Sequence, residues 1–341
     1  MATATKDKNA VLERYGDRSV RKALGDWGRD ARHRKALNTV QGNMGGYTVP
    51  TALLVNLDLV LQEACVFHRL ASTFEMAAKQ VEVPTYDLTH SHATGDSPLY
   101  GGMGMRWGVG EGNVISEFDP SFNSGSLVAK DLQGLFKASD QLVADGGEGL
   151  GLTLEKGFLA LVEWAVERAC FRGTFADEPQ GVVNSPASAV VSRAGAGAVA
   201  AADLANMVQA LVPACFARAV WCCHPTALSD VAKLASYQVQ SGTSDDVVGL
   251  CGHIFGRPLY ATEKLLAKGT KGDLVLFDPK QYVLGRRCLE LAAAPSINTS
   301  LIATGQTLFR VLWRGDGMFL AKNTVLLENN STTCGVSVVL N

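Results

Sequence analysis

The chain has 341 residues, of which 47% are apolar, and its formal net charge is −2. This length is enough for two or three packed units with a sizeable core that needs neither metal ions nor disulfides. A charge so close to neutrality does not by itself indicate affinity for nucleic acid or membranes. The apolar runs are too short to span a bilayer. The N-terminus lacks the apolar region of a signal peptide, so we expect synthesis in a cytoplasm.

The first 44 residues have the composition of a basic arm. Residues 1–40 hold ten Lys or Arg and five Asp or Glu, a net +5 that leaves −7 for the other 301 residues. Such asymmetry indicates an arm that faces a polyanion. Apolar residues recur at roughly helical spacing, but three Gly each weaken that helix by about 1 kcal/mol. We therefore expect the arm to order on contact; the alternative is a solvated amphipathic helix without a partner.

A long hairpin is expected after the arm. Gly45-Gly46-Tyr47-Thr48-Val49-Pro50 leads into an apolar helical pattern over 50–70, and strand patterns follow at 81–86 and 113–118. Six of the twelve residues 101–112 are Gly, and so long a connection is unusual inside a compact domain. An isolated hairpin is marginal in water, so we expect this one to lie on a neighbouring subunit through Leu99, Tyr100, Met103, Met105 and Trp107.

The clearest helix pattern covers residues 153–172 and stops at Gly173. Pro179-Gln180-Gly181 then predicts a turn, and the Gly, Ala and Val of 194–202 a pliant connector.

A second unit alternates helices and strands. We expect Asp203 to cap a helix that runs to about Arg218, and Pro225 to open a helix that runs to about Tyr237. Strands are expected at 219–223, 257–260, 273–277, 282–284, 307–314, 323–328 and 336–340.

No pattern of catalytic or cofactor-binding residues emerges. The eight Cys form no C-x-x-C pair, and we expect most of them to be reduced and packed in the core. Cys222-Cys223-His224 lacks the spacing of structural zinc sites and indicates the end of a buried strand. His90 and His92 have no acidic or Cys partner nearby, and Asp245, Asp246 and Glu111 are lone carboxylates in loops. The Gly-rich 101–112 matches neither phosphate-binding fingerprint. We expect no catalytic residue, no cofactor and no metal.

The order of these elements resembles the HK97-fold major capsid proteins of tailed bacteriophages. The resemblance rests on Gly45–Pro50 as the entry into the folded subunit, 76–130 as an extended loop, 153–172 as a spine helix, Pro179-Gln180-Gly181 as a turn, Trp221 followed by Pro225, Gly256-Arg257-Pro258, Phe309-Arg310, and Arg314-Gly315-Asp316-Gly317 as the returning strand and its turn. Each motif alone is weak, but their order and spacing together are fairly specific.

The resemblance implies an α+β fold, the HK97-like capsid fold, divided along the chain. Its parts would be an N-terminal arm at 1–44, a first segment of the peripheral domain at 45–75, the extended β-hairpin loop at 76–130, the peripheral domain with the spine helix at 131–192, an axial α/β domain at 193–292, and peripheral return strands at 293–341.

The resemblance also implies a function without catalysis. Subunits would assemble as pentamers and hexamers into an icosahedral shell around double-stranded DNA, with a separate scaffolding protein, a portal and a decoration protein as further partners, and no membrane. The inner-face contacts to DNA or scaffold would be Arg14, Arg18, Arg21, Lys22, Arg29, Arg32, Arg34 and Lys35. A nanocompartment or gene-transfer particle of the same fold is the alternative, and a soluble α/β enzyme is a remote one.

Two departures from the family pattern bear on maturation. Some relatives crosslink their subunits through a Lys in the extended loop, but this chain has no Lys between Lys79 and Lys130. We therefore expect no covalent crosslinking. Only about 44 residues precede the entry motif, where some relatives carry a cleaved scaffolding segment, so we also expect no maturation cleavage.

Overall fold

The computed structural model describes residues 65–88, 120–195, 197–239, 250–294, 306–327 and 332–341, together with scattered positions between 100 and 117. The predicted arm, the Gly45–Pro50 motif and the beginning of the helix expected at 50–70 lie outside the described residues. The chain divides into two compact units, which we describe separately. The first comprises Met1–Gln62, Asp131–Glu163 and Arg287–Arg314, and the second Glu63–Lys130, Trp164–Arg286 and Gly315–Asn341.

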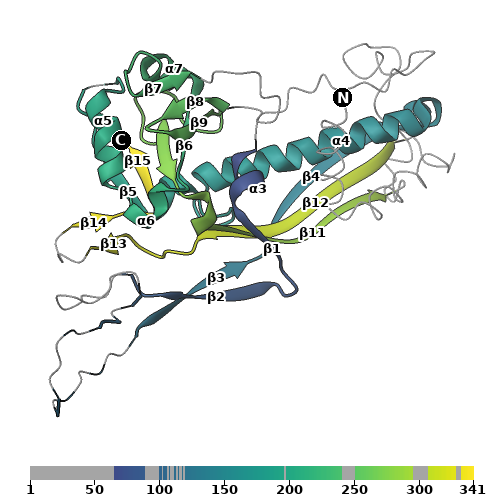
Figure 1. The fold of residues 1–341 in the computed structure, drawn as a ribbon. Helices are drawn as coiled ribbons and strands as arrows, with labels where there is room; N and C mark the ends of the chain where they lie inside the picture. The colour runs from purple at the N-terminus through teal and green to yellow at the C-terminus, as the bar shows by residue number, and fades with distance from the viewer. Residues whose placement is uncertain are drawn as a thin grey trace, which may run out of the picture. The chain divides into compact units, whose positions relative to one another are not determined.

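The first unit packs strands against the beginning of a long helix. Its elements belong to β4 (Lys130–Ser139), α4 (Asp140–Arg172), β11 (Tyr282–Ala294) and β12 (Gln306–Phe319). With β1 (Ser72–Glu75), the strands form a sheet in the order β1-β11-β12-β4 (Figure 1). The Phe136 ring stacks between Phe158 of α4, at 4.4 Å, and Phe309 of β12, at 4.8 Å. These rings tie the helix to the sheet within this unit.

Helix α4 is longer than the sequence pattern predicts. It ends at Arg172, as expected, but begins at Asp140 rather than at Thr153. Gly146, Gly147, Gly149 and Gly151 lie in the added turns, and each disfavours a helix by about 1 kcal/mol relative to Ala. The start at 153 was wrong because propensity is a weak guide that tertiary context overrides.

A seven-stranded mixed sheet forms the body of the second unit, in the order β5-β15-β10-β6-β9-β8-β7. The strands are β5 (Ser188–Val191), β6 (Val220–Cys223), β7 (Tyr237–Val239), β8 (Leu250–Ile254), β9 (Arg257–Ala261), β10 (Leu274–Phe277) and β15 (Ser337–Leu340). Every residue of the central strands β6, β10 and β15 is buried, which confirms the strands predicted at 219–223, 273–277 and 336–340. The smaller pair β13 (Val325–Leu326) and β14 (Thr333–Cys334) is antiparallel.

The three helices between β5 and β7 begin where Pro and acidic residues indicate, but they are shorter than predicted. They are α5 (Ala201–Gln209), which lies beside β5 and β15 (Figure 1), α6 (Pro213–Phe216) and α7 (Pro225–Val231). The single helix predicted from Asp203 to Arg218 was wrong, because Pro213 lacks an N–H and starts a new helix. Asp203 occupies the third position of α5 and reaches back, accepting N–H groups from Ala194 at 2.7 Å and Ala200 at 2.8 Å.

The extended hairpin consists of β2 (Gln80–Tyr86) and β3 (Phe122–Val128), paired antiparallel from Gln80 opposite Val128 to Tyr86 opposite Phe122. The first strand confirms the pattern at 81–86. Most of the strand predicted at 113–118 lies outside the described residues; the described partner of β2 lies further along the chain, in a segment rich in Asn, Ser and Gly. Its Leu127 is buried in a cluster with Met76, Ala129, Val283 and Met318, and this packing selects the strand despite its low intrinsic propensity.

A cluster of aromatic rings fills the core of the second unit. Phe67 of α3 (Val66–Leu70) lies 4.9 Å from Phe171, 5.0 Å from Phe277 and 4.7 Å from Tyr282 between ring centroids. Tyr282 in turn meets Phe319 edge-on at 5.2 Å. The cluster thus gathers side chains from α3, α4, β10, β11 and β12, and such ring pairs add about 0.5–1.5 kcal/mol each beyond their buried area.

Asp316 clamps the base of the hairpin. Its carboxylate accepts the N–H of Val128 at 3.0 Å and pairs with Lys130 at 3.2 Å. The Lys130 ammonium also donates to the carbonyl oxygens of Phe175, at 3.2 Å, and Glu178, at 2.7 Å. One buried ion pair therefore joins the end of β3, the loop after α4, and β12.

Replacing Asp316 with Ala should destabilise the fold and loosen the hairpin, because it leaves the Lys130 charge without its carboxylate partner and the Val128 N–H without its acceptor. Removing one partner of a buried ion pair costs about 3–5 kcal/mol. Urea unfolding of the full-length chain measures the loss, and limited proteolysis of the hairpin measures the loosening.

Asp131→Ala is the matched control. Its ion pair with Arg314 spans 2.5 Å but is partly exposed, at 40% and 27%, and pairs of this kind contribute about 0–1 kcal/mol. Equal losses in the two variants would contradict the clamp.

Candidate assembly surfaces

The hairpin is continued beyond its two strands by single backbone hydrogen bonds. The Asp87 N–H donates to the carbonyl of Ser121, and the Ser121 N–H to that of Gly101, both at 3.0 Å. Gly101 has φ +63°, and a Cβ there would lie 2.4 Å from the Ser121 oxygen. Only glycine fits this turn, so Gly101 permits the close approach of the two sides of the hairpin at this point.

Three aromatic side chains gather beside the end of β2 and the beginning of β3. We call these residues, Tyr86, Tyr100 and Phe122, the hairpin aromatic patch. The Tyr86 ring lies 5.8 Å from that of Tyr100 and 5.2 Å from that of Phe122. All three remain exposed, Tyr100 by 52% and Phe122 by 63%. The patch is an apolar surface of the kind that marks interaction sites.

Of the residues predicted for docking, Tyr100 belongs to this patch, and its carbonyl accepts the Met103 N–H at 3.2 Å. Trp107 is 99% exposed and Met105 88%, Met103 is half-buried, and Leu99 lies outside the described residues. The sequence reasoning missed Tyr86 and Phe122. The alternation of β2 could have indicated Tyr86, because Glu82, Pro84 and Tyr86 share the exposed face of the strand.

A second exposed surface is the loop of residues 174–178, which follows α4. Close backbone contact between Gly173 and Gly181 closes it, since a Cβ on Gly181 would lie 2.4 Å from the Gly173 nitrogen. Phe175 has φ +68°, a conformation that costs a non-glycine residue about 1–3 kcal/mol. The Lys130 ammonium lies 4.3 Å from its ring centroid. The clamp thus holds this loop, with its acidic Asp177 and Glu178, in one conformation.

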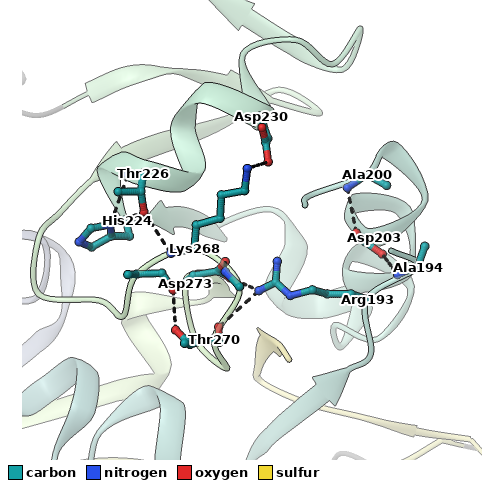
Figure 2. Close-up of polar contacts among 12 residues, drawn as sticks. Arg193, Ala194, Ala200, Asp203, His224, Thr226, Asp230, Lys268, Thr270 and Asp273 are labelled. Carbon is teal, nitrogen blue, oxygen red and sulfur yellow. Dashed lines mark hydrogen bonds and ion pairs between the residues drawn. The ribbon is translucent and has the colours of Figure 1, made fainter. Parts of the chain in front are cut away.

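Ion pairs fix the loops at one end of the seven-stranded sheet (Figure 2). Arg193 Nη2 donates to Asp273 Oδ1 at 2.5 Å, and the Gly269 N–H donates to the other oxygen of that carboxylate at 2.9 Å. The Lys268 ammonium pairs with Asp230 of α7 at 2.5 Å. These contacts join the segment after β5 to the loop before β10.

His224 acts as a helix cap. Its Nδ1 accepts the Thr226 N–H at 3.2 Å at the start of α7 (Figure 2). In the part of the chain that the structure describes, no three His, Cys, Asp or Glu residues gather as metal ligands. His90, His92, Asp245 and Asp246 lie outside the described residues.

Buried thiols account for most of the described cysteines, as predicted. Cys170, Cys215, Cys222, Cys223 and Cys334 are buried, and none of the eight cysteines, all of which lie among the described residues, forms a disulfide. Burial raises the pKa of Cys215 and of Cys223 to about 12. These two side chains are therefore neutral thiols near pH 7, which are poor nucleophiles.

The arm residues predicted to contact DNA or scaffold lie outside the described residues, so their surroundings stay a prediction. No described helix is both long enough and apolar enough to cross a membrane.

Comparisons with known proteins agree with the architecture. A sequence profile described as the phage capsid family matches residues 45–327, whereas no curated protein gives a significant match. The capsid protein of an empty GTA particle is 19% identical, with a TM-score of 0.63 over 89% of this chain and 99% of that chain. The protein of Microbacterium phage Oxtober96 is 14% identical, with a TM-score of 0.56 and the same coverage.

An encapsulin is also similar. The holo-SrpI encapsulin of Synechococcus elongatus is 13% identical, with a TM-score of 0.50 over 86% of this chain and 90% of that chain. At such identities the structural matches establish the fold, and the profile match over most of the sequence establishes the family. The chain belongs to the phage capsid family and is a shell protein with the HK97 fold.

Proposed function

We propose that copies of this chain assemble as pentamers and hexamers into a closed icosahedral shell around double-stranded DNA. The observation that carries the proposal is the exposed aromatic hairpin in a chain of this family. The two similar GTA structures are capsids of particles determined with C5 symmetry, which favours a five-fold assembly here too. A structural role also fits the described residues, among which we identify no group of catalytic side chains.

The hairpin tip would dock on an adjacent subunit. Tyr100, Met105 and Trp107 are apolar side chains on a segment that has too many Gly to build a core of its own. Trp and Tyr are the anchor types that dominate interface energies. Contact with a second copy would remove these side chains from water, and Leu99 and Met103 belong to the same proposed surface.

The basic arm would face the interior of the shell. Its net charge of +5 contrasts with −7 for the rest of the chain, and phosphate contacts made by Lys and Arg supply affinity without sequence preference. The proposed contacts are Arg14, Arg18, Arg21, Lys22, Arg29, Arg32, Arg34 and Lys35. A separate scaffolding protein, a portal and a decoration protein remain predictions, as do the domain limits at 193 and 292 and assembly in a host cytoplasm.

A nanocompartment or a gene-transfer particle is the second candidate, favoured by the likeness to the SrpI encapsulin and to the GTA capsid. The contents of the particle separate these functions: protein cargo indicates a nanocompartment, phage DNA a virion, and host DNA a gene-transfer particle.

The full-length chain should form closed shells visible by electron microscopy, and Trp107→Ala should leave the subunit folded but weaken the shell. Losing such an anchor costs about 2 kcal/mol or more per contact, and a shell repeats the contact in every subunit. Calorimetry of assembled particles should give a lower melting temperature, while circular dichroism of unassembled subunits should match the wild type. Glu111→Ala, an exposed polar position of the same loop, is the control. Shells of Trp107→Ala that melt like the wild type would rule out the docking role.

Neutralising the arm should lower the DNA content of the particles. In the variant Arg18→Gln, Arg21→Gln, Lys22→Gln, Arg29→Gln, four positive charges are lost, and retention should weaken further as salt rises. The control keeps the charge, with Arg18→Lys, Arg21→Lys and Arg29→Lys, and should package normally. The measurement is the ratio of absorbance at 260 and 280 nm of purified particles. Unchanged packaging and assembly yield in the Gln variant would count against this role.

A further inference from the structure

A buried carboxyl group lies where residues 1–64 join the described structure. Glu167 of α4 is fully buried. It accepts the N–H of Val66 at 2.5 Å and that of Phe67 at 3.0 Å. The first N–H groups of a helix have no partner inside the helix, and the cap residue of α3, Cys65, makes no side-chain cap. Glu167 therefore supplies, from a distant helix, the acceptor that α3 lacks.

These two hydrogen bonds hold a residue of the aromatic core. Phe67 is completely buried, and its ring packs on Phe171, Phe277 and Tyr282. If α3 left its place, Phe67 would leave the aromatic cluster and the Glu167 carboxyl would meet water. The state of this carboxyl and the docking of α3 are thus linked.

The surroundings of Glu167 favour its neutral form. Burial raises its pKa from 4.5 to about 7, against the opposing effects of the Phe67 N–H, buried Lys264 and the N–H groups of Val66 and His68. Cys170 on the same helix and Tyr282 on β11 also face it, and burial raises the pKa of both. These two groups remain neutral near pH 7, so they do not compete for the proton in this range.

We propose that Glu167 is a pH-sensitive latch on α3, firm when its carboxyl is protonated and weakened when it is ionised. In the docked state the carboxyl holds its proton up to about pH 7, whereas in water it would lose it near pH 4.5. Docking therefore takes up a proton between these two values, and acid favours the docked state. The stabilisation is fully present below about pH 4.5 and is lost as the pH rises through about 7.

The size of the effect follows from the two pKa values. Between pH 5 and pH 8 the docking equilibrium should shift toward release by on the order of 10²-fold. The latch concerns the single subunit and does not depend on the proposed shell. In a shell it would make the attachment of the N-terminal segment sensitive to acidity.

Glu167→Gln tests the latch, because the amide is uncharged at every pH and resembles the protonated acid. The unfolding equilibrium of the full-length chain is measured in urea from pH 5 to pH 8. The wild type should lose stability relative to the variant by on the order of 10²-fold as the pH rises. The contribution of His68, which lies on α3 itself, cancels to first order in this difference. Glu82→Gln, at an exposed position of β2, is the control and should differ from the wild type by a constant amount.

Hydrogen exchange of the Val66 and Phe67 amides provides a local reading that does not need the variant to fold. After correction for intrinsic exchange rates, their protection in the wild type should fall between pH 6 and pH 8. Protection that is independent of pH, or a constant stability difference between the wild type and Glu167→Gln, would overturn the proposal.

Discussion

A two-stranded ribbon cannot bury its own side chains, and this constraint shapes the second unit. An isolated hairpin is marginally stable in water, so β2 and β3 need support at the base and at the tip. The base has it: Leu127 packs beside Met318, and Asp316 binds both the Val128 N–H and Lys130. The other end of the paired strands instead presents Tyr86, Tyr100 and Phe122 to water. The hairpin is thus anchored at its base and exposed at its other end, which suits the proposed docking on a second copy.

Much of the fold could be predicted from local patterns. The buried strands β6 and β10 are short apolar runs, and the end of α4 is marked by Gly173, where a Cβ would lie 2.0 Å from the Pro179 oxygen. Two of the failures share one cause. The Gly residues that precede position 153 concealed the beginning of α4, and the polar composition of residues 122–128 concealed β3. In both segments tertiary packing decides against local propensity.

Some residues of the candidate site could likewise be predicted from local patterns, and others could not. Exposed Met105 and Trp107 could be suspected from their Gly-rich context, whereas the clamp and the latch could not. Asp316 acts on a residue 188 positions away, and Glu167 on one 101 positions away. The segment Arg314-Gly315-Asp316-Gly317, expected to contain a turn, instead continues β12 to Phe319. No local pattern shows that an acidic residue in an apolar segment will meet a particular amide or amine.

The carboxyl groups of Glu167 and Asp316 are both buried, but different neighbours offset their loss of hydration. Burial raises the pKa of Asp316, while a direct ion pair with Lys130 and the N–H groups of Val128 and Gly317 oppose the rise. Burial also raises the pKa of Glu167, and the rise is opposed by the N–H groups of Phe67, Val66 and His68 and by the charge of Lys264. A direct ion pair favours the ionised carboxylate, so Lys130 opposes the protonation of Asp316. A carboxyl bound chiefly by neutral donors can exchange its proton near neutrality. The same residue chemistry therefore yields a fixed clamp at the hairpin and an adjustable one at α3.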